Sequence, residues 1–248
     1  MRILLTGTLL ALMLPASAQA SISFGATFDA DNGGVTKLNA DGTNLAAFSV
    51  VPNSGTVDLV HTGDGFGIVC AGGPGGCIDL DGSTGDAGII VSKPAFSFGA
   101  GDQVNLSFLI SGNQRNLAAA DTWFGGVSFG GLLNMSNIVL DAGCGSFASA
   151  NGAYNGLFVG AGACPTFGNT PFALRTVSFT AGQSGTLHLL FGDAVGADNI
   201  GAILDNVVLR VESPAVPEPA TWMMMIAGFA MVGRAMRRRR PVARVTYA

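Results

Sequence analysis

A serine, an aspartate and a histidine occur in an order that could support nucleophilic hydrolysis. Residues 126–130 match the G-x-S-x-G pattern around Ser128, and Asp141 and His188 follow further along the chain. A nucleophilic serine of this kind sits on a sharp turn from a strand into a helix. The residues after Phe129, Gly-Gly-Leu-Leu-Asn, have no helical periodicity, and His188 alternates with leucines as on the outer face of a strand. We therefore predict no catalytic residues and no enzyme activity.

Aspartates in turns could bind calcium. The segments DADNG, from Asp29, and DLDG, from Asp79, present closely spaced oxygens, although neither matches the twelve-residue EF-hand loop. Asp205 is different, because in the strand pattern 203–211 it shares a face with valine and leucine side chains. A carboxylate on such a face needs a partner, since unpaired burial is costly. The partner is either a cation or Arg115, unless Asp205 lies at a strand end in solvent.

Trp123 could form a sugar-binding platform. Binding sites for small ligands combine aromatic rings with a few polar groups that fix the orientation of the ligand. Asn113, Gln114 and Arg115 supply such groups a few residues earlier in the chain. The same pattern fits core packing of Trp123 next to a turn. The sequence therefore leaves carbohydrate binding and core packing as alternatives.

The four cysteines indicate disulfides in an oxidising compartment. An even number of cysteines permits two bridges, and three connectivities are possible. We favour Cys70–Cys77 around the AGGPGG loop and Cys144–Cys164 around an irregular Gly- and Ala-rich region, because short separations make encounter easy. A zinc site is the rival interpretation, but no C-x-x-C pair occurs and both histidines lie far off in sequence.

Charge excludes one class of partner. Charged residues make up 11% of the 248 residues, well below the ~25% usual for soluble domains. Residues 21–216 carry five basic and fifteen acidic side chains, a net charge of −10. Such a body repels phosphate backbones, so we expect no nucleic-acid partner.

The elements that must position these residues are short strands. In residues 103–110, Val104, Leu106 and Phe108 share one face, while Asn105 and Ser107 face the other way. Similar strand patterns recur between clusters of Gly, Asn and Asp, and no long segment has helical periodicity. We predict an all-β domain over residues 21–211, a β-sandwich or barrel, followed by a Pro-rich linker over residues 212–219.

The N-terminus is a predicted signal peptide. Residues 1–20 combine an early arginine, a short apolar run and an Ala-Gln-Ala ending. This pattern is typical of export, so we expect signal peptidase to cut after Ala20. The alternative is an uncleaved anchor helix, which this short run fits poorly.

The C-terminus is a predicted membrane anchor. We expect a single transmembrane helix over residues 220–236, with Trp222 at one interface, and a basic cytoplasmic tail over residues 237–248. The apolar run is short for a span, and snorkelling of Arg234 would close part of the gap. The arginine cluster would stay in the cytoplasm and leave the body outside.

The C-terminal segment resembles the PEP-CTERM sorting signal. Its three parts are the proline motif, an apolar helix and an arginine cluster. The residues are Pro217, Glu218, Pro219, Trp222, Arg237, Arg238, Arg239 and Arg240. The resemblance implies recognition and processing by exosortase, after a transient stay in the inner membrane of a Gram-negative bacterium that makes exopolysaccharide. A plain tail anchor with a chance Pro-Glu-Pro is the alternative.

The body resembles the galactose-binding-like jelly-roll sandwiches often attached to such signals. The resemblance rests on residues 79–85 (DLDGSTG), 112–115 (GNQR) and 201–207 (GAILDNV). It implies a jelly-roll-like β-sandwich. It also implies a structural calcium between an early and a late strand, with Asp29, Asp31 and Asp205 as ligands. No other cofactor is expected.

Three functions remain open at this point. The first is a structural protein of the cell surface or of the exopolysaccharide matrix of a biofilm. The second is a carbohydrate-binding module that uses Trp123, Asn113 and Arg115. The third, a secreted hydrolase, has the least support, because the sequence offers no defensible triad.

Overall fold

A computed structural model describes residues 21–116, 120–129, 146–147, 158–162, 166–193, 198–214 and 219–238. The chain divides into a body, residues 20–214, and a second unit that contains the C-terminal helix, and each is described by itself. Several predictions lie outside the described residues: the signal peptide with its cut after Ala20, the Cys144–Cys164 bridge, the Pro217-Glu218 pair, and Arg239 with Arg240.

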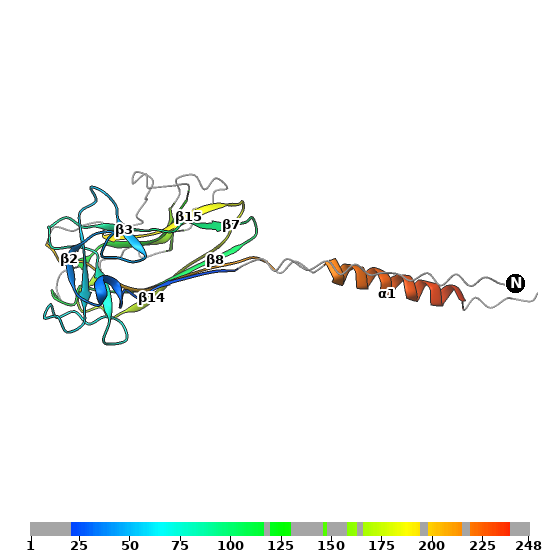
Figure 1. Ribbon diagram of the computed structural model, residues 1–248, viewed down its shortest axis with the longest axis horizontal. Helices are drawn as coiled ribbons and strands as arrows, with labels where there is room; N and C mark the ends of the chain where they lie inside the picture. The colour runs from blue at the N-terminus through cyan, green and yellow to red at the C-terminus, as the bar shows by residue number, and fades with distance from the viewer. Residues whose placement is uncertain are drawn as a thin grey trace, which may run out of the picture. The chain divides into compact units, whose positions relative to one another are not determined.

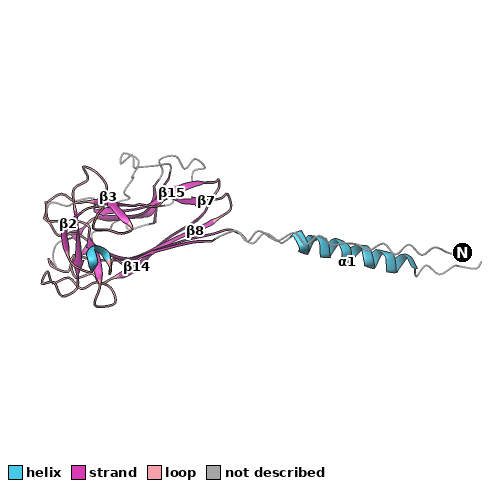
Figure 2. Ribbon diagram, viewed as in Figure 1, coloured by secondary structure: helices cyan, strands magenta, loops and turns pink. Residues whose placement is uncertain are grey.

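The described body consists of strands and one short 3-10 helix (Figures 1 and 2). In chain order these are β1 Ile22–Ala26, η1 Asp31–Gly33, β2 Lys37–Ala40, β3 Phe48–Val50, β4 Val57–His61, β5 Gly76–Asp79, β6 Ile89–Ser92, β7 Phe96–Phe98, β8 Gln103–Ser111, β9 Ala120–Asp121, β10 Trp123–Phe129, β11 Ser146–Phe147, β12 Phe158–Gly162, β13 Thr166–Phe167, β14 Ala173–Thr180, β15 Gly185–Asp193 and β16 Ile203–Glu212.

The strands form two antiparallel sheets that pack on each other. The first has the order β14-β8-β16-β5-β4-β2, with β1 also paired to β16. The second has the order β11-β12-β10-β15-β6-β3, with β7 also paired to β15. A small third sheet joins β13 and β9. The predicted all-β sandwich is therefore confirmed.

Alternation along the strands decides which side chains enter the core. In β8, Val104, Leu106, Phe108 and Ile110 are buried, and the residues between them are only partly covered, as predicted. Aromatic rings then join the two sheets. The ring of Phe108 lies 5.0 Å from that of Phe191 on the facing sheet, in an edge-to-face arrangement that stabilises such pairs.

The C-terminal unit contains one helix, α1 Pro219–Arg238. Its position matches the predicted segment 220–236. Among the helices that the structure describes, however, none is both long and apolar enough to cross a membrane. Arg234, Arg237 and Arg238 lie within this helix. The transmembrane span over residues 220–236 stays a prediction.

Candidate functional site

A disulfide closes a glycine-rich loop on the body. Cys70 and Cys77 are joined, as predicted, with 5.5 Å between their Cα atoms, and both side chains are buried. Gly72 and Gly73 adopt left-handed φ angles of 84° and 109°. A β-carbon on either would meet nothing within 4 Å, so the space beside both glycines is open.

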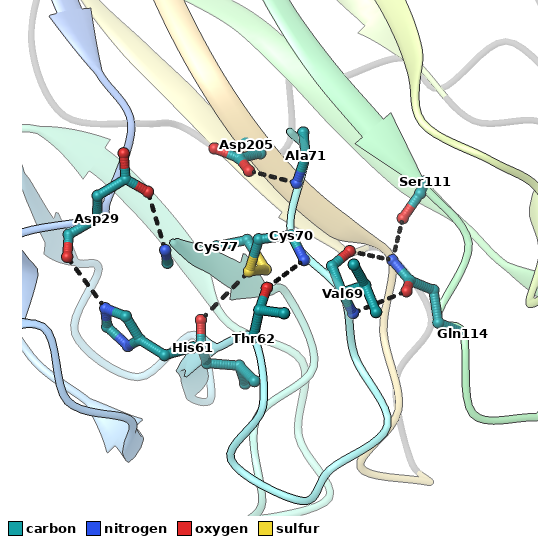
Figure 3. The surroundings of a disulfide bond; sticks show 12 residues. Asp29, His61, Thr62, Val69, Cys70, Ala71, Cys77, Ser111, Gln114 and Asp205 are labelled. Carbon is teal, nitrogen blue, oxygen red and sulfur yellow. Dashed lines mark hydrogen bonds between the residues drawn. A yellow bond between two sulfur atoms is a disulfide. The ribbon is translucent and has the colours of Figure 1, made fainter. Parts of the chain in front are cut away.

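Two carboxylates hold the ends of this loop (Figure 3). The Ala71 N–H donates to Oδ2 of Asp205 at 2.9 Å, and the Gly76 N–H donates to Oδ1 of Asp29 at 2.9 Å. Thr62 adds a third tie, because its hydroxyl accepts from the Cys70 N–H at 2.9 Å and donates to a loop carbonyl at 2.8 Å. The loop is therefore fixed at both ends by groups that come from distant parts of the chain.

A hollow of about 640 Å³ lies beside the disulfide loop. One wall is the loop itself, residues 69–73, and the other is the turn over residues 168–172. Leu109 of β8 and Gln114 also line it. Leu109 lies opposite Asp205 and Leu174 in the ladders of the first sheet, so the hollow opens on the outer face of that sheet.

Gln114 joins the two walls of the hollow. Its side-chain oxygen accepts from the Val69 N–H at 3.0 Å, and its side-chain nitrogen donates to the Val69 carbonyl at 3.1 Å and to the Ser111 hydroxyl at 3.1 Å (Figure 3). Its backbone N–H donates to the Gly168 carbonyl at 3.0 Å. Gln114 adopts a left-handed φ of 60°, which costs conformational energy in a residue other than glycine. The hollow is thus built before any ligand arrives.

The hollow lies at the end of the sandwich opposite to the chain's exit. β8 and β16 pair from Gln103 with Glu212 at one end to Ser111 with Ile203 at the other. The exit follows Glu212, whereas Asp205 lies beside the hollow. Seven residues of extended strand separate these two positions, which is about 23 Å.

Asp205 is buried, but not on the face that the strand pattern predicted, and its partners differ from both predicted ones. A register shift between Asp205 and Val208 places Asp205 opposite Leu109 on the outer face of the sheet, whereas Leu209 lies opposite Leu106 on the core face. Its two oxygens accept the N–H groups of Ala71 and Asn206. The pKa of Asp205 is raised to about 6, chiefly by burial and to a smaller extent by the nearby charge of Asp29, while the hydrogen bonds from Ala71 and Asn206 oppose the shift. The partner is thus the backbone of the disulfide loop, a contact that spans 134 positions in the sequence.

The predicted calcium ligands do not form a set. Asp29 and Asp205 hold opposite ends of the disulfide loop. Burial raises the pKa of Asp31, whose electrostatic neighbours are Lys93 and His61. Among the residues that the structure describes, no three His, Cys, Asp or Glu side chains are placed to hold one metal ion. The calcium site predicted at Asp29, Asp31 and Asp205 is therefore not seen as a cluster of three carboxylates in the described part of the chain.

The three motifs of the body resemblance meet around Asp79. Arg115 forms a salt bridge with one oxygen of Asp79, and the N–H groups of Asp81 and Gly201 donate to the other at 3.1 and 2.8 Å. Burial raises the pKa of Asp79 well above its usual range, although the Arg115 guanidinium opposes this effect. Arg115 also donates to the Asn199 carbonyl at 2.8 Å. This cluster locks one end of the sandwich.

The predicted sugar platform is contradicted by burial. Trp123 is only 2% exposed, its ring packs edge-on against Phe108, and its N–H donates to the Thr166 hydroxyl at 2.9 Å. Asn113 is fully buried and donates to Asp121. Core packing beside a turn, the alternative reading, is therefore the correct one for Trp123.

The serine and histidine of the hydrolase pattern are neighbours on adjacent strands, but no hydrogen bond joins their side chains. Ser128 on β10 and His188 on β15 are directly opposite in the ladder. His188 instead bonds through Nδ1 to the Ser92 carbonyl at 2.9 Å. Ser128 lies inside a strand rather than on a strand-to-helix turn, and Asp141 is outside the described residues.

The residues that line the hollow were not identified from the sequence as candidate binding residues. Gln114 belongs to the GNQR motif, so its importance could have been inferred, although its bond to Val69 could not. Val69 and Phe172 carry no sequence signal, because nothing local indicates that the loop and the turn meet.

Comparison with known proteins identifies the C-terminal segment. Residues 215–240 match the PEP-CTERM protein-sorting motif. The chain thus carries a PEP-CTERM sorting motif behind an all-β body. The motif indicates a secreted protein that transits the membrane and is sorted to the cell surface.

The body was also compared with curated proteins and with solved structures. No curated protein matches. The K1 cleaved adhesin domain of Lys-gingipain from Porphyromonas gingivalis W83 is similar at 14% identity and a TM-score of 0.40, over 78% of this chain and 99% of that one. The CBM22-1 xylan-binding domain of Paenibacillus barcinonensis Xyn10C is similar at 13% identity and a TM-score of 0.41, over 80% and 100%. Similarity this low carries no information on ligand or activity.

Proposed function

We propose that exosortase processes this chain and delivers its body to the cell surface or exopolysaccharide matrix, where the body has a structural, non-enzymatic role. The sorting motif at residues 215–240 carries the proposal, because it begins directly after the body ends at residue 214. The buried disulfide supports it, since such bridges persist in oxidising compartments outside the cytoplasm.

Cell fractionation with a matched pair of variants tests this role. Glu218→Ala changes the sorting motif, and Glu212→Ala removes a similar charge six residues earlier, at the exposed end of β16. We expect Glu218→Ala to keep the full-length chain in the membrane fraction and Glu212→Ala to be processed normally. Mass spectrometry of the mature protein, with and without exosortase, reports both termini. Equal processing of the two variants, or processing without exosortase, would contradict the proposal.

Carbohydrate binding is a second candidate function. The hollow beside the disulfide loop favours it, because it is preformed and lies at the end of the body away from the sorting motif's attachment point. A body tethered by its C-terminus would present this end to surrounding polymer. Retention on the polysaccharide of the producing cell, measured with the mature protein, tests this function. No retention would leave the structural role alone.

A further inference from the structure

The hollow offers an apolar surface to a ligand. Val69 on one wall is 53% exposed, and Leu109 and Phe172 are half-buried. Leu174, opposite Leu109 on the neighbouring strand, is 63% exposed, so the apolar area continues onto β14. Exposed apolar area gathered around a concavity marks a binding surface rather than a solvated one.

The lining contains no charged residue among those described. Its polar side chains are Gln114, Asn169 and Thr170, with the Cys70 sulfur behind them. The carboxylate of Asp205, which accepts from the Ala71 N–H in one wall, is buried. The body as a whole carries an excess of acidic residues, which opposes the approach of an anionic polymer. The ligand that fits is therefore uncharged.

Binding in the hollow requires little ordering of the protein, because the walls of the hollow are already fixed. The disulfide, the Asp205 bond and the two-sided Gln114 contact already fix both walls. A preorganised site retains binding energy that a mobile loop would lose on ordering. A volume of about 640 Å³ lies within the range of ordinary small-ligand pockets.

Resting on the proposed carbohydrate-binding role, we infer that this hollow is a preformed site for an uncharged polysaccharide. The apolar faces of sugar rings pack against Val69, Leu109 and Phe172, and their hydroxyls meet Asn169 and Thr170. The site rejects acidic glycans because it supplies no cation and lies on an acidic body. Trp123 has no part in it.

Affinity electrophoresis tests the inference with defined probes. The full chain, purified in detergent with its disulfide intact, is run in gels that contain dextran, mannan or galactan, and in a gel that contains anionic polygalacturonate. We expect one or more of the uncharged polymers to retard it and polygalacturonate not to. Val69→Asp and Asn169→Ala each alter an exposed side chain of the hollow. The first should weaken binding at least tenfold and the second severalfold.

Val35→Asp is the matched control. Val35 is 60% exposed, similar to Val69, but does not line the hollow, so this variant should be retarded like the unchanged chain. Thermal melting confirms that all variants fold. Retardation that Val69→Asp leaves unchanged would place the sugar elsewhere and overturn the inference, while the carbohydrate-binding role would stand. Retardation by polygalacturonate would overturn the charge selectivity. No retardation by dextran, mannan or galactan would overturn the inference of a site for uncharged polysaccharides, and retention on the polysaccharide of the producing cell would then decide separately whether the binding role stands.

Discussion

The stability of the body should fall as pH rises through 6, and Asp205 should account for a measurable part of this change. Its pKa is raised from 3.8 to about 6, chiefly by burial. A group whose pKa is higher in the folded state binds protons more tightly there, so its contribution to stability is full below pH 3.8 and lost as pH rises through 6. A shift of about two units corresponds to about 3 kcal/mol.

Asp205→Asn removes this titration and keeps an oxygen that can accept the Ala71 N–H. Urea unfolding at pH 5.0, 6.0, 7.0 and 8.0 measures the free energy of unfolding at each pH. We expect the unchanged chain to lose more stability between pH 5.0 and 8.0 than Asp205→Asn, by about 1.4 kcal/mol, because the rest of the ~3 kcal/mol is already lost below pH 5. Asp121, whose pKa burial also raises to about 6, should leave part of the slope in the variant.

Asp41→Asn is the control for Asp205→Asn. Asp41 is exposed, and hydrogen bonds from Thr43 lower its pKa, so it titrates below the measured range. This variant should therefore keep the full pH dependence. If Asp205→Asn and the unchanged chain showed the same slope, Asp205 would not be a buried, ionising group, and the reasoning on the disulfide loop would fail with it.

Three further changes test the packing of the body by denaturant unfolding. Cys77→Ala opens an eight-residue ring and should cost about 2.5 kcal/mol, and reductant should lower the stability of the unchanged chain by about that much more than the stability of the variant. Arg115→Met leaves Asp79 buried without its cation and should cost about 3 kcal/mol, and a loss below 1 kcal/mol would show that the pair is dispensable. Gly112→Ala places a β-carbon 2.0 Å from a backbone oxygen and should destabilise strongly, whereas Gly25→Ala, with 3.9 Å of clearance, should be tolerated; equal effects would refute the close packing at residue 112.

The sequence predicted correctly those features that depend on residues close together in the chain. The alternation in residues 103–110 placed the correct face of β8 in the core, because side chains alternate along any strand. The seven-residue separation of Cys70 and Cys77 made their pairing easy to predict. The sorting motif is contiguous, so the sequence alone contained all of it.

Contacts between distant segments could not be predicted. The sequence could not decide whether Trp123 forms a sugar platform or packs in the core, because the residues that enclose its ring, Phe108 and Thr166, come from other strands. The partner of Asp205 is a backbone N–H from a loop far earlier in the chain, and backbone donors leave no mark in a sequence. Simple alternation along residues 203–211 also placed Asp205 on the core face, because it could not include the register shift between Asp205 and Val208 that turns Asp205 outward under the disulfide loop.

The length of the disulfide loop can change without changing the fold of the body. Covalent and hydrogen bonds secure the two ends of the loop, and the Thr62 hydroxyl holds the Gly73 carbonyl. An insertion between Gly72 and Gly73, beside which the space is open, would therefore leave these ties and the strands beneath them unchanged. A segment grafted there would extend the rim of the neighbouring hollow. The same scaffold could therefore be adapted to different polymers through changes at one short stretch of chain.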